Sequence, residues 1–163
     1  PDNFDNFMSF MIATIDATLA SQNVALAAEA QGLGICYMGS TLANCDRIGR
    51  LLCLPPGVMP VVGYSLGWPD ENPAPRDRLP LSGLVHRETY HDYTDEDILA
   101  IYAERNRKGW ERYMTYPELR TRIEGSGVQN LAQIYTVLKY TRESHIEFSG
   151  TVLDYLREQG FLN

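Results

Sequence analysis

Residues 31–40 constrain the fold of this chain most, because a long apolar segment changes there to a short strand. Their sequence is Gln-Gly-Leu-Gly-Ile-Cys-Tyr-Met-Gly-Ser. Gly32 is a natural helix stop, because glycine takes the left-handed C-terminal conformation without a steric cost. The residues after it predict a strand over 34–37 and a loop over 38–40. Loops at the carboxyl ends of strands commonly bind ligands in α/β proteins, so we expect a ligand near residues 38–40.

The segment before this stop has the pattern of a helix with one apolar face, and we expect it to run from 7 to 31. Its large apolar residues recur at steps of three and four: Phe4, Phe7, Met8, Met11, Ile12, Ile15 and Leu19. Its second half is small on every side, with alanine at positions 20, 25, 27, 28 and 30. Small side chains let other backbones approach, which places this half in a core or a subunit interface. Asp16 is predicted to be a hydrogen-bonded interior carboxylate.

Composition and length favour one domain over residues 1–163, because 163 residues with 44% hydrophobic side chains can build one core. The net charge of −7 and the interleaving of basic with acidic residues argue against a nucleic-acid partner. No apolar run approaches the roughly 18 residues of a membrane span, and there is no signal peptide, so we expect a cytoplasmic protein without a membrane partner. The chain starts at Pro1 within an organised pattern, from which we expect that an N-terminal portion is missing.

Turn residues and caps divide the rest of the chain. Before the proline-rich loop over 67–80 we predict a short helix capped by Asn44 and a strand over 59–66 that is buried on both faces. After it we predict an extended segment over 81–90, a helix from Thr94 to about Arg107, and a mobile polar stretch over 108–127. The chain should end with a helix over 128–140 and a last helix that runs from a capping box at 144–147 to Gly160. Four prolines within residues 67–80 restrict φ, so this loop should be ordered and semi-rigid.

Two arginines on the proline-rich loop are candidates for binding phosphate. The guanidinium groups of Arg76 and Arg78 suit phosphate oxygens, and a stiff loop lowers the cost of presenting them. The alternative is that both are solvated loop residues that pair with Asp77 or Glu71. Glycines at 32, 34 and 39 either allow a flat ligand to approach or serve only the backbone.

No residue pattern indicates covalent catalysis or a metal site. His86 and His91 lie five residues apart in a segment predicted to be extended, without a third ligand. His145 is predicted to be a surface residue, and Cys36, Cys45 and Cys53 to be reduced, packed thiols. We therefore predict no catalytic side chain, and in an enzyme of this kind a bound cofactor would supply the chemistry.

Several motifs in order resemble the FMN-dependent nitroreductase superfamily, in its oxygen-insensitive nitroreductase and flavin reductase branch. They are Ile15 to Asn23, Ala27 to Gly34, Tyr37-Met38-Gly39, Leu51 to Pro55, Gly67-Trp68-Pro69 and Arg78-Leu79-Pro80. The resemblance runs from about residue 10 to residue 90, and the closing helix at 153–161 is similar more weakly.

The resemblance implies a homodimer of an α+β fold, with a mostly antiparallel sheet flanked by helices and a long central helix at the dimer interface. It implies that FMN lies along the backbone of Tyr37, Met38, Gly39 and Ser40, and that Arg78 and Arg76 reach its phosphate. It also implies that NAD(P)H donates hydride and that the flavin passes it to a small-molecule electron acceptor, such as a nitroarene, a quinone or a flavin.

The chain departs from this family in two places. The family's His/Arg/Ser phosphate-binding cluster has no counterpart before Pro1. Asp77 stands where the matching branch has proline, and we expect its carboxylate to neutralise Arg76 and weaken phosphate binding there. The competing hypothesis is a non-catalytic member of the fold that binds a small molecule or only dimerises. The physiological acceptor and the choice between NADH and NADPH are open, since the basic residues over 105–112 fit either a 2′-phosphate site or a solvated face.

Overall fold

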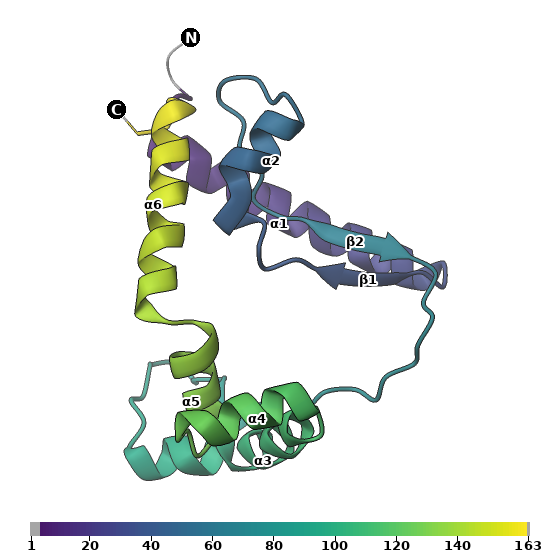
Figure 1. The fold of residues 1–163 in the computed structure, drawn as a ribbon. Coiled ribbons are helices and arrows are strands. Elements are labelled where there is room, and N and C mark those ends of the chain that lie inside the picture. The colour runs from purple at the N-terminus through teal and green to yellow at the C-terminus, as the bar shows by residue number, and fades with distance from the viewer. Residues whose placement is uncertain (1–3, 163) are drawn as a thin grey trace. The chain divides into compact units, whose positions relative to one another are not determined.

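A computed structural model describes residues 4–162. By its internal packing the chain divides into two compact units. The first unit holds the residues up to Asn72 together with those from Arg142 onward, and the second holds Pro73–Thr141. Figure 1 labels the elements of both units. The single-domain expectation stays a prediction.

The first unit is built on the helix α1 (Phe7–Ala30) and a two-stranded antiparallel ribbon. The side chain of Asn6 caps α1 by accepting a hydrogen bond from the Ser9 amide at 3.0 Å. Gly32 ends the helical stretch with a φ of 77°. The strands β1 (Gly34–Tyr37) and β2 (Tyr64–Gly67) pair along their whole length, and β1 packs against α1 (Figure 1). The predicted helix and the predicted first strand are confirmed.

Most of α1 is exposed in this chain. Its buried residues are Ser21, Ala25 and Ala28, which face β1 at steps of four and three. Its larger apolar residues Phe7, Met8, Met11, Ile12, Ile15 and Leu19 are between 39% and 66% exposed. The prediction that this apolar face is buried is therefore wrong for the chain by itself, and Asp16 is exposed rather than interior. The expectation of a subunit interface stays a prediction.

The length and composition of α1 also meet the criteria for a helix that could cross a membrane. The expectation that no apolar run approaches that length is thus wrong. The evidence for a membrane is weak, because core helices of soluble proteins and signal sequences meet the same criteria.

The remaining helices of the first unit pack on one another. They are η1 (Leu42–Asn44), α2 (Cys45–Leu51) and α6 (Arg142–Glu158). Cys45, Tyr155 and Leu156 are almost fully buried where α2 and α6 meet. Gly49 of α2 permits this contact, because a Cβ atom there would lie 1.9 Å from the Tyr155 hydroxyl oxygen. The close approach of α2 to α6 therefore depends on the absence of a side chain at position 49.

The predicted strand over 59–66 is wrong in its start and in its burial. Only 64–67 is a strand, and all but Tyr64 of it is exposed. The ladder continues one step before β2, where the Met38 amide donates to the Gly63 carbonyl at 2.8 Å. Pro60 has no amide hydrogen to extend the pairing further.

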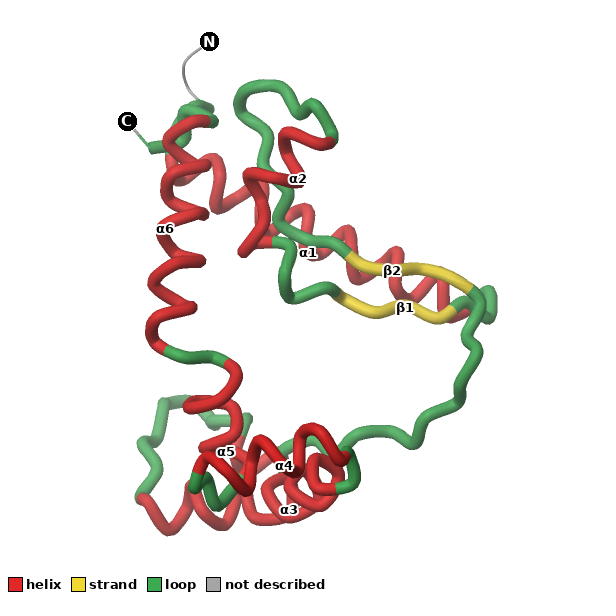
Figure 2. Tube along the Cα trace, viewed as in Figure 1, coloured by secondary structure: helices red, strands yellow, loops and turns green. Residues whose placement is uncertain are grey.

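The second unit begins with a long loop, shown in green after β2 in Figure 2, and continues as a helical cluster. Its elements are η2 (Leu81–Gly83), α3 (Asp95–Met114), α4 (Pro117–Ser126), α5 (Leu131–Gln133) and η3 (Ile134–Lys139). Its core consists of Tyr113, Ile123, Leu131 and Ile134.

The segment predicted to be mobile, 108–127, is helical instead. Here α3 continues to Met114, and α4 begins with proline at its first turn, where the missing amide hydrogen costs nothing. Ile123 is buried in the core of the unit, so contacts with residues distant in sequence stabilise α4. The polar residues around Ile123 gave no indication of these contacts. The predicted extended segment over 81–90 is also wrong, because it opens with η2 and contains Glu88 at a φ of 63°.

The last part of the second unit contains a π-helical turn. In η3 the amide of Tyr140 bonds to the carbonyl of Tyr135, five residues earlier, at 2.8 Å. The ammonium group of Lys139 donates to the Tyr113 hydroxyl and lies 4.5 Å from the centre of that ring. The wide turn therefore brings Tyr135 and Lys139 onto the residues of α3.

The predicted start of a helix at Thr94 is confirmed, and a capping box forms there. Thr94 Oγ1 accepts from the Asp97 amide at 3.2 Å, and Asp97 Oδ2 accepts from the Thr94 amide at 3.0 Å. The hydrogen bond from the Thr94 backbone, followed by that from its hydroxyl, holds the pKa of Asp97 below its ordinary value.

We expect the stabilising effect of Asp97 to depend on its ionisation. A lowered folded-state pKa contributes stability above the unfolded-state value of about 4, and this is lost as the pH falls through the folded-state pKa. Asp97→Asn should therefore lower the free energy of unfolding at neutral pH, and the gap to the unmodified protein should close as the pH falls. Urea unfolding at several pH values checks this, and a gap independent of pH contradicts it.

Candidate functional site

The loop that follows β1 is exposed and leaves backbone donors available. Tyr37 is anchored by its hydroxyl, which lies 3.3 Å from Ser21 Oγ of α1, and by an edge contact with the ring of Tyr64. The Met38 carbonyl accepts from the Thr41 hydroxyl at 2.9 Å. Within residues 4–162, the amides of Gly39 and Ser40 donate no hydrogen bond to protein atoms. A rigid strand end thus presents two amides to a ligand.

Gly39 leaves open space beside this backbone. A Cβ atom at position 39 would meet no atom within 4 Å, and the residue has no left-handed φ. Nothing in the chain itself requires glycine here. The glycine at position 39 suits the close approach of a ligand, which was one of the two interpretations of this residue.

Four arginines line one small cavity in the second unit. Arg76 and Arg78 come from the proline-rich loop, and Arg105 and Arg112 come from α3. The cavity measures about 90 Å³, and its other lining residues are Asp77, Gly109, Leu131 and Tyr135. The Arg78 guanidinium also donates to the Arg76 carbonyl at 3.2 Å, which ties the two loop arginines together. Guanidinium groups gathered in this way suit an anion with several oxygens, such as phosphate.

Among residues 4–162, the cavity arginines have no carboxylate partner, unlike Arg107 and Lys108 of α3. Arg107 pairs with Glu104 and Glu111 at 2.9 and 2.8 Å, and Lys108 pairs with Asp77 at 2.8 Å. In the described part of the chain, no ion pair involves Arg76, Arg78, Arg105 or Arg112. The positive charge of the cavity is therefore available to a ligand. Pairing of Arg76 and Arg78 with nearby acids is not found among the described residues, but both side chains are exposed, so the alternative of solvated loop residues stays open.

Asp77 does not neutralise Arg76, contrary to expectation. Its carboxylate bonds to the Lys108 ammonium, and this hydrogen bond raises the pKa of Lys108. Tyr135 contributes a hydroxyl to the cavity wall. The hydrogen bond from Tyr113, together with burial, raises the pKa of Tyr135, so this hydroxyl stays neutral at physiological pH.

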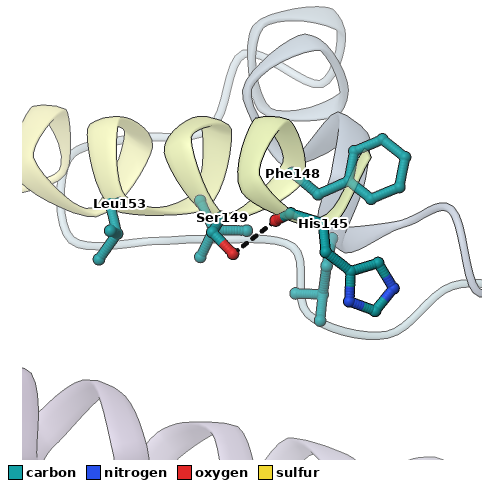
Figure 3. A pocket seen from close by; sticks show the side chains of 6 residues that line it. His145, Phe148, Ser149 and Leu153 are labelled. Carbon is teal, nitrogen blue, oxygen red and sulfur yellow. Dashed lines mark hydrogen bonds between the residues drawn. The ribbon is translucent and has the colours of Figure 1, made fainter. Parts of the chain in front are cut away.

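A larger, mainly apolar pocket lies in the first unit and was not predicted from the sequence. It measures about 440 Å³ and is lined by Leu42, His145, Phe148, Ser149, Val152 and Leu153. Figure 3 shows the labelled side chains along α6, with the Ser149 hydroxyl donating to the His145 carbonyl at 2.7 Å. The spacing of Phe148 and Val152, four residues apart on a helix, was the signal available in the sequence.

The predicted site residues fall in both units. Tyr37, Met38, Gly39 and Ser40 belong to the first, and Arg76 and Arg78 to the second, where the structure adds Arg105, Arg112 and Tyr135 to them.

The contacts and burial of the histidines and cysteines considered in the sequence analysis can be compared with the predictions. His86 accepts from the His91 amide at 3.2 Å and lies against the rings of Tyr90 and Tyr93. All three cysteines are free, but only Cys45 is buried, so the prediction of packed thiols fails for Cys36 and Cys53. Among residues 4–162, no group of His, Cys, Asp and Glu could hold a metal ion.

Comparisons with known proteins point to one family. Residues 9–68 match the nitroreductase family. The chain superposes on an oxidoreductase structure from Bacteroides fragilis NCTC 9343 with a TM-score of 0.85 and 38% identity, covering 99% of this chain and 62% of that one. Residues 9–68 of this chain are therefore similar to the nitroreductase family. The expected nitroreductase-like α+β fold is thereby confirmed.

Two curated relatives show the range of similar enzymes. The chain is 39% identical over 92 residues to the FMN reductase (NADPH) of Bacillus subtilis strain 168, which is 56% of this chain and 37% of that protein. It is 39% identical over 94 residues to the oxygen-insensitive NADPH nitroreductase of Salmonella typhimurium strain LT2, which is 58% of this chain and 39% of that protein. These matches span well under half the length of either relative.

Proposed function

We propose that this protein is an FMN-dependent oxidoreductase that uses NAD(P)H to reduce small-molecule electron acceptors such as nitroarenes, quinones or flavins. The observation that carries the proposal is the cavity with four arginines that form no ion pair within the described residues, in a chain similar to the nitroreductase family. The names of similar proteins, an FMN reductase and a nitroreductase that both use NADPH, support the cofactor and favour NADPH as the donor.

The residues of the chain fit the phosphate end of FMN. Arg78 and Arg76 would hold the phosphate by charge-assisted hydrogen bonds, and Arg105, Arg112 and the Tyr135 hydroxyl would complete its surroundings. Separately, in the first unit, the backbone of residues 37–40 would contact a flavin, with the Gly39 and Ser40 amides as donors. Bound FMN would supply the chemistry by accepting hydride and passing it on, and the protein groups would bind and orient it.

A homodimer and a cytoplasmic location belong to the same proposal. The exposed apolar residues of α1 are those that a helix at a subunit interface would bury. The small residues of its second half would allow two chains to approach closely. Gel filtration or analytical ultracentrifugation should give twice the mass of one chain, and a monomer with bound FMN would contradict the dimer.

The test of the function starts with purified full-length protein. We expect it to be yellow, to bind FMN in a titration, and to consume NAD(P)H when a nitroarene or quinone is added. Protein that is colourless and gains no flavin absorbance with added FMN contradicts the proposal. Stoichiometric FMN without consumption of NAD(P)H favours the second candidate, a non-catalytic binding protein, for which the apolar pocket along α6 is the supporting observation.

A methyl group at position 39 should weaken FMN binding and leave the fold intact. Gly39→Ala places a Cβ atom where a ligand would approach the backbone, and it meets no protein atom. We expect a loss of about 1 kcal/mol or more, roughly fivefold in affinity. Gly67→Ala is the matched control, because position 67 also has open space and lies at the other end of β2. Equal FMN affinities for both variants, measured by fluorescence titration, would remove Gly39 from the site.

A further inference from the structure

The proline-rich loop is attached to α3 by a single ion pair between oppositely charged side chains. Asp77 Oδ1 lies 2.8 Å from Lys108 Nζ, and the two side chains are 31% and 42% exposed. Lys108 also lies 3.1 Å from Glu104 of its own helix, which orients the ammonium group. Among residues 4–162 no other ion pair joins residues 73–80 to α3.

A second contact fixes the direction in which this segment runs. Gly83 packs so closely on Ile101 that a Cβ atom would lie 2.5 Å from the Ile101 side chain. The segment therefore meets α3 near residue 101 and again near residue 108, about 10 Å apart along the helix at 1.5 Å per residue. Because the later loop residue meets the earlier helix residue, the segment runs antiparallel to α3.

These two attachments place the loop arginines opposite those of α3. Arg105, Gly109 and Arg112 share one face of α3 at steps of four and three, and Lys108 stands beside that face. Four guanidinium groups around one cavity repel each other, so the loop needs an attraction to stay against the helix. The Asp77–Lys108 pair is the attraction that the structure provides.

We propose that the Asp77–Lys108 ion pair is a positioning device that holds Arg76 and Arg78 against the arginines of α3, so that the four together bind the phosphate of the flavin. This rests on the proposed function. A carboxylate beside an anion site would be expected to weaken phosphate binding by repulsion. In this proposal Asp77 strengthens phosphate binding instead, because it positions the arginines.

A double-mutant cycle separates positioning from simple charge. If only charge matters, Asp77→Asn tightens FMN binding, Lys108→Met weakens it, and the effects add. If the pair positions the loop, each substitution weakens FMN binding by about two- to fivefold, and the double variant is no weaker than the worse single one. Riboflavin, which lacks the phosphate, should bind all variants equally. Arg120→Met removes the same charge from α4 of the same unit, where Arg120 pairs with Glu124, and is the matched control.

Two further measurements keep the outcomes distinct. The exchanged pair, Asp77→Lys with Lys108→Asp, should recover much of the FMN affinity lost in either single variant. Hydrogen exchange of the amides at 76–79 in flavin-free protein should be several-fold faster in Asp77→Asn and Lys108→Met than in the unmodified protein. Tighter FMN binding in Asp77→Asn, or unchanged exchange, overturns the proposal. Absence of FMN binding in unmodified protein overturns the proposed function, and the exchange measurement still decides whether the pair holds the loop.

Discussion

Replacing Arg78 with alanine should weaken FMN binding by about 1.5–3 kcal/mol, roughly 10- to 150-fold, which is the range for hydrogen bonds to a charged group. Arg78 lines the arginine cavity, has no carboxylate partner, and is held by the Arg76 carbonyl. Its removal deprives the phosphate of a preorganised donor. Isothermal titration calorimetry at fixed ionic strength measures the effect, and Arg76→Ala should also weaken binding.

The control for Arg78→Ala is a substitution that removes the same charge elsewhere in the second unit. Arg120→Ala breaks an ion pair with Glu124 on α4, and Arg120 does not line the cavity. We expect it to leave FMN affinity within twofold of the original, about 0.4 kcal/mol. Riboflavin binding should be equal in Arg78→Ala and the unmodified protein. If FMN affinity is unchanged in Arg78→Ala, the cavity is not the phosphate site.

Alanine at position 49 should destabilise the first unit by about 1–3 kcal/mol, the usual cost of extra volume in a packed core. The new Cβ atom would lie 1.9 Å from the hydroxyl oxygen and 2.6 Å from Cζ of Tyr155, which is itself buried. An aromatic ring cannot move aside as the end of a flexible side chain can. Elsewhere on a helix the same change stabilises by up to about 1 kcal/mol, so the sign of the effect is informative.

Gly150→Ala on α6 supplies that comparison, because its Cβ atom would meet no atom within 4 Å. We expect thermal unfolding to give a lower melting temperature for Gly49→Ala and an equal or higher one for Gly150→Ala. Adding Tyr155→Phe to Gly49→Ala should recover part of the loss, since it removes the nearer of the two clashing atoms. A melting temperature for Gly49→Ala at or above that of the original protein would show that α2 and α6 do not pack as described.

Local chemistry made part of this fold predictable. The strand at 34–37 and the start of α3 were found because a glycine stop and a reciprocal cap act within a few residues. The segment at 108–127 was misjudged because its order comes from Ile123, whose partners in the core lie elsewhere in the sequence. The exposure of α1 was misjudged for the opposite reason, since an apolar stripe indicates that a face can be buried without indicating what covers it.

The candidate site was predictable to a similar degree. The residue types of the loop pointed to Arg76 and Arg78, whereas the basic residues over 105–112 were interpreted as a 2′-phosphate site or a solvated face and not as part of the same cavity. Which acid pairs with which base was not predictable. Asp77 lies next to both loop arginines in sequence, yet bonds to a lysine 31 residues away. Tyr135 reaches the cavity through a π-helical turn, which no residue pattern in this segment indicated.

That turn limits how the length of the chain can change. A π-helical turn absorbs one residue more than an α-helical turn, so deleting one residue within 134–139 would change which residues of this turn face α3. Tyr135 lines the arginine cavity and Lys139 donates to the Tyr113 hydroxyl, and both residues belong to this turn. Related sequences should therefore tolerate exchanges of residue type in this segment far more readily than the loss of a single position.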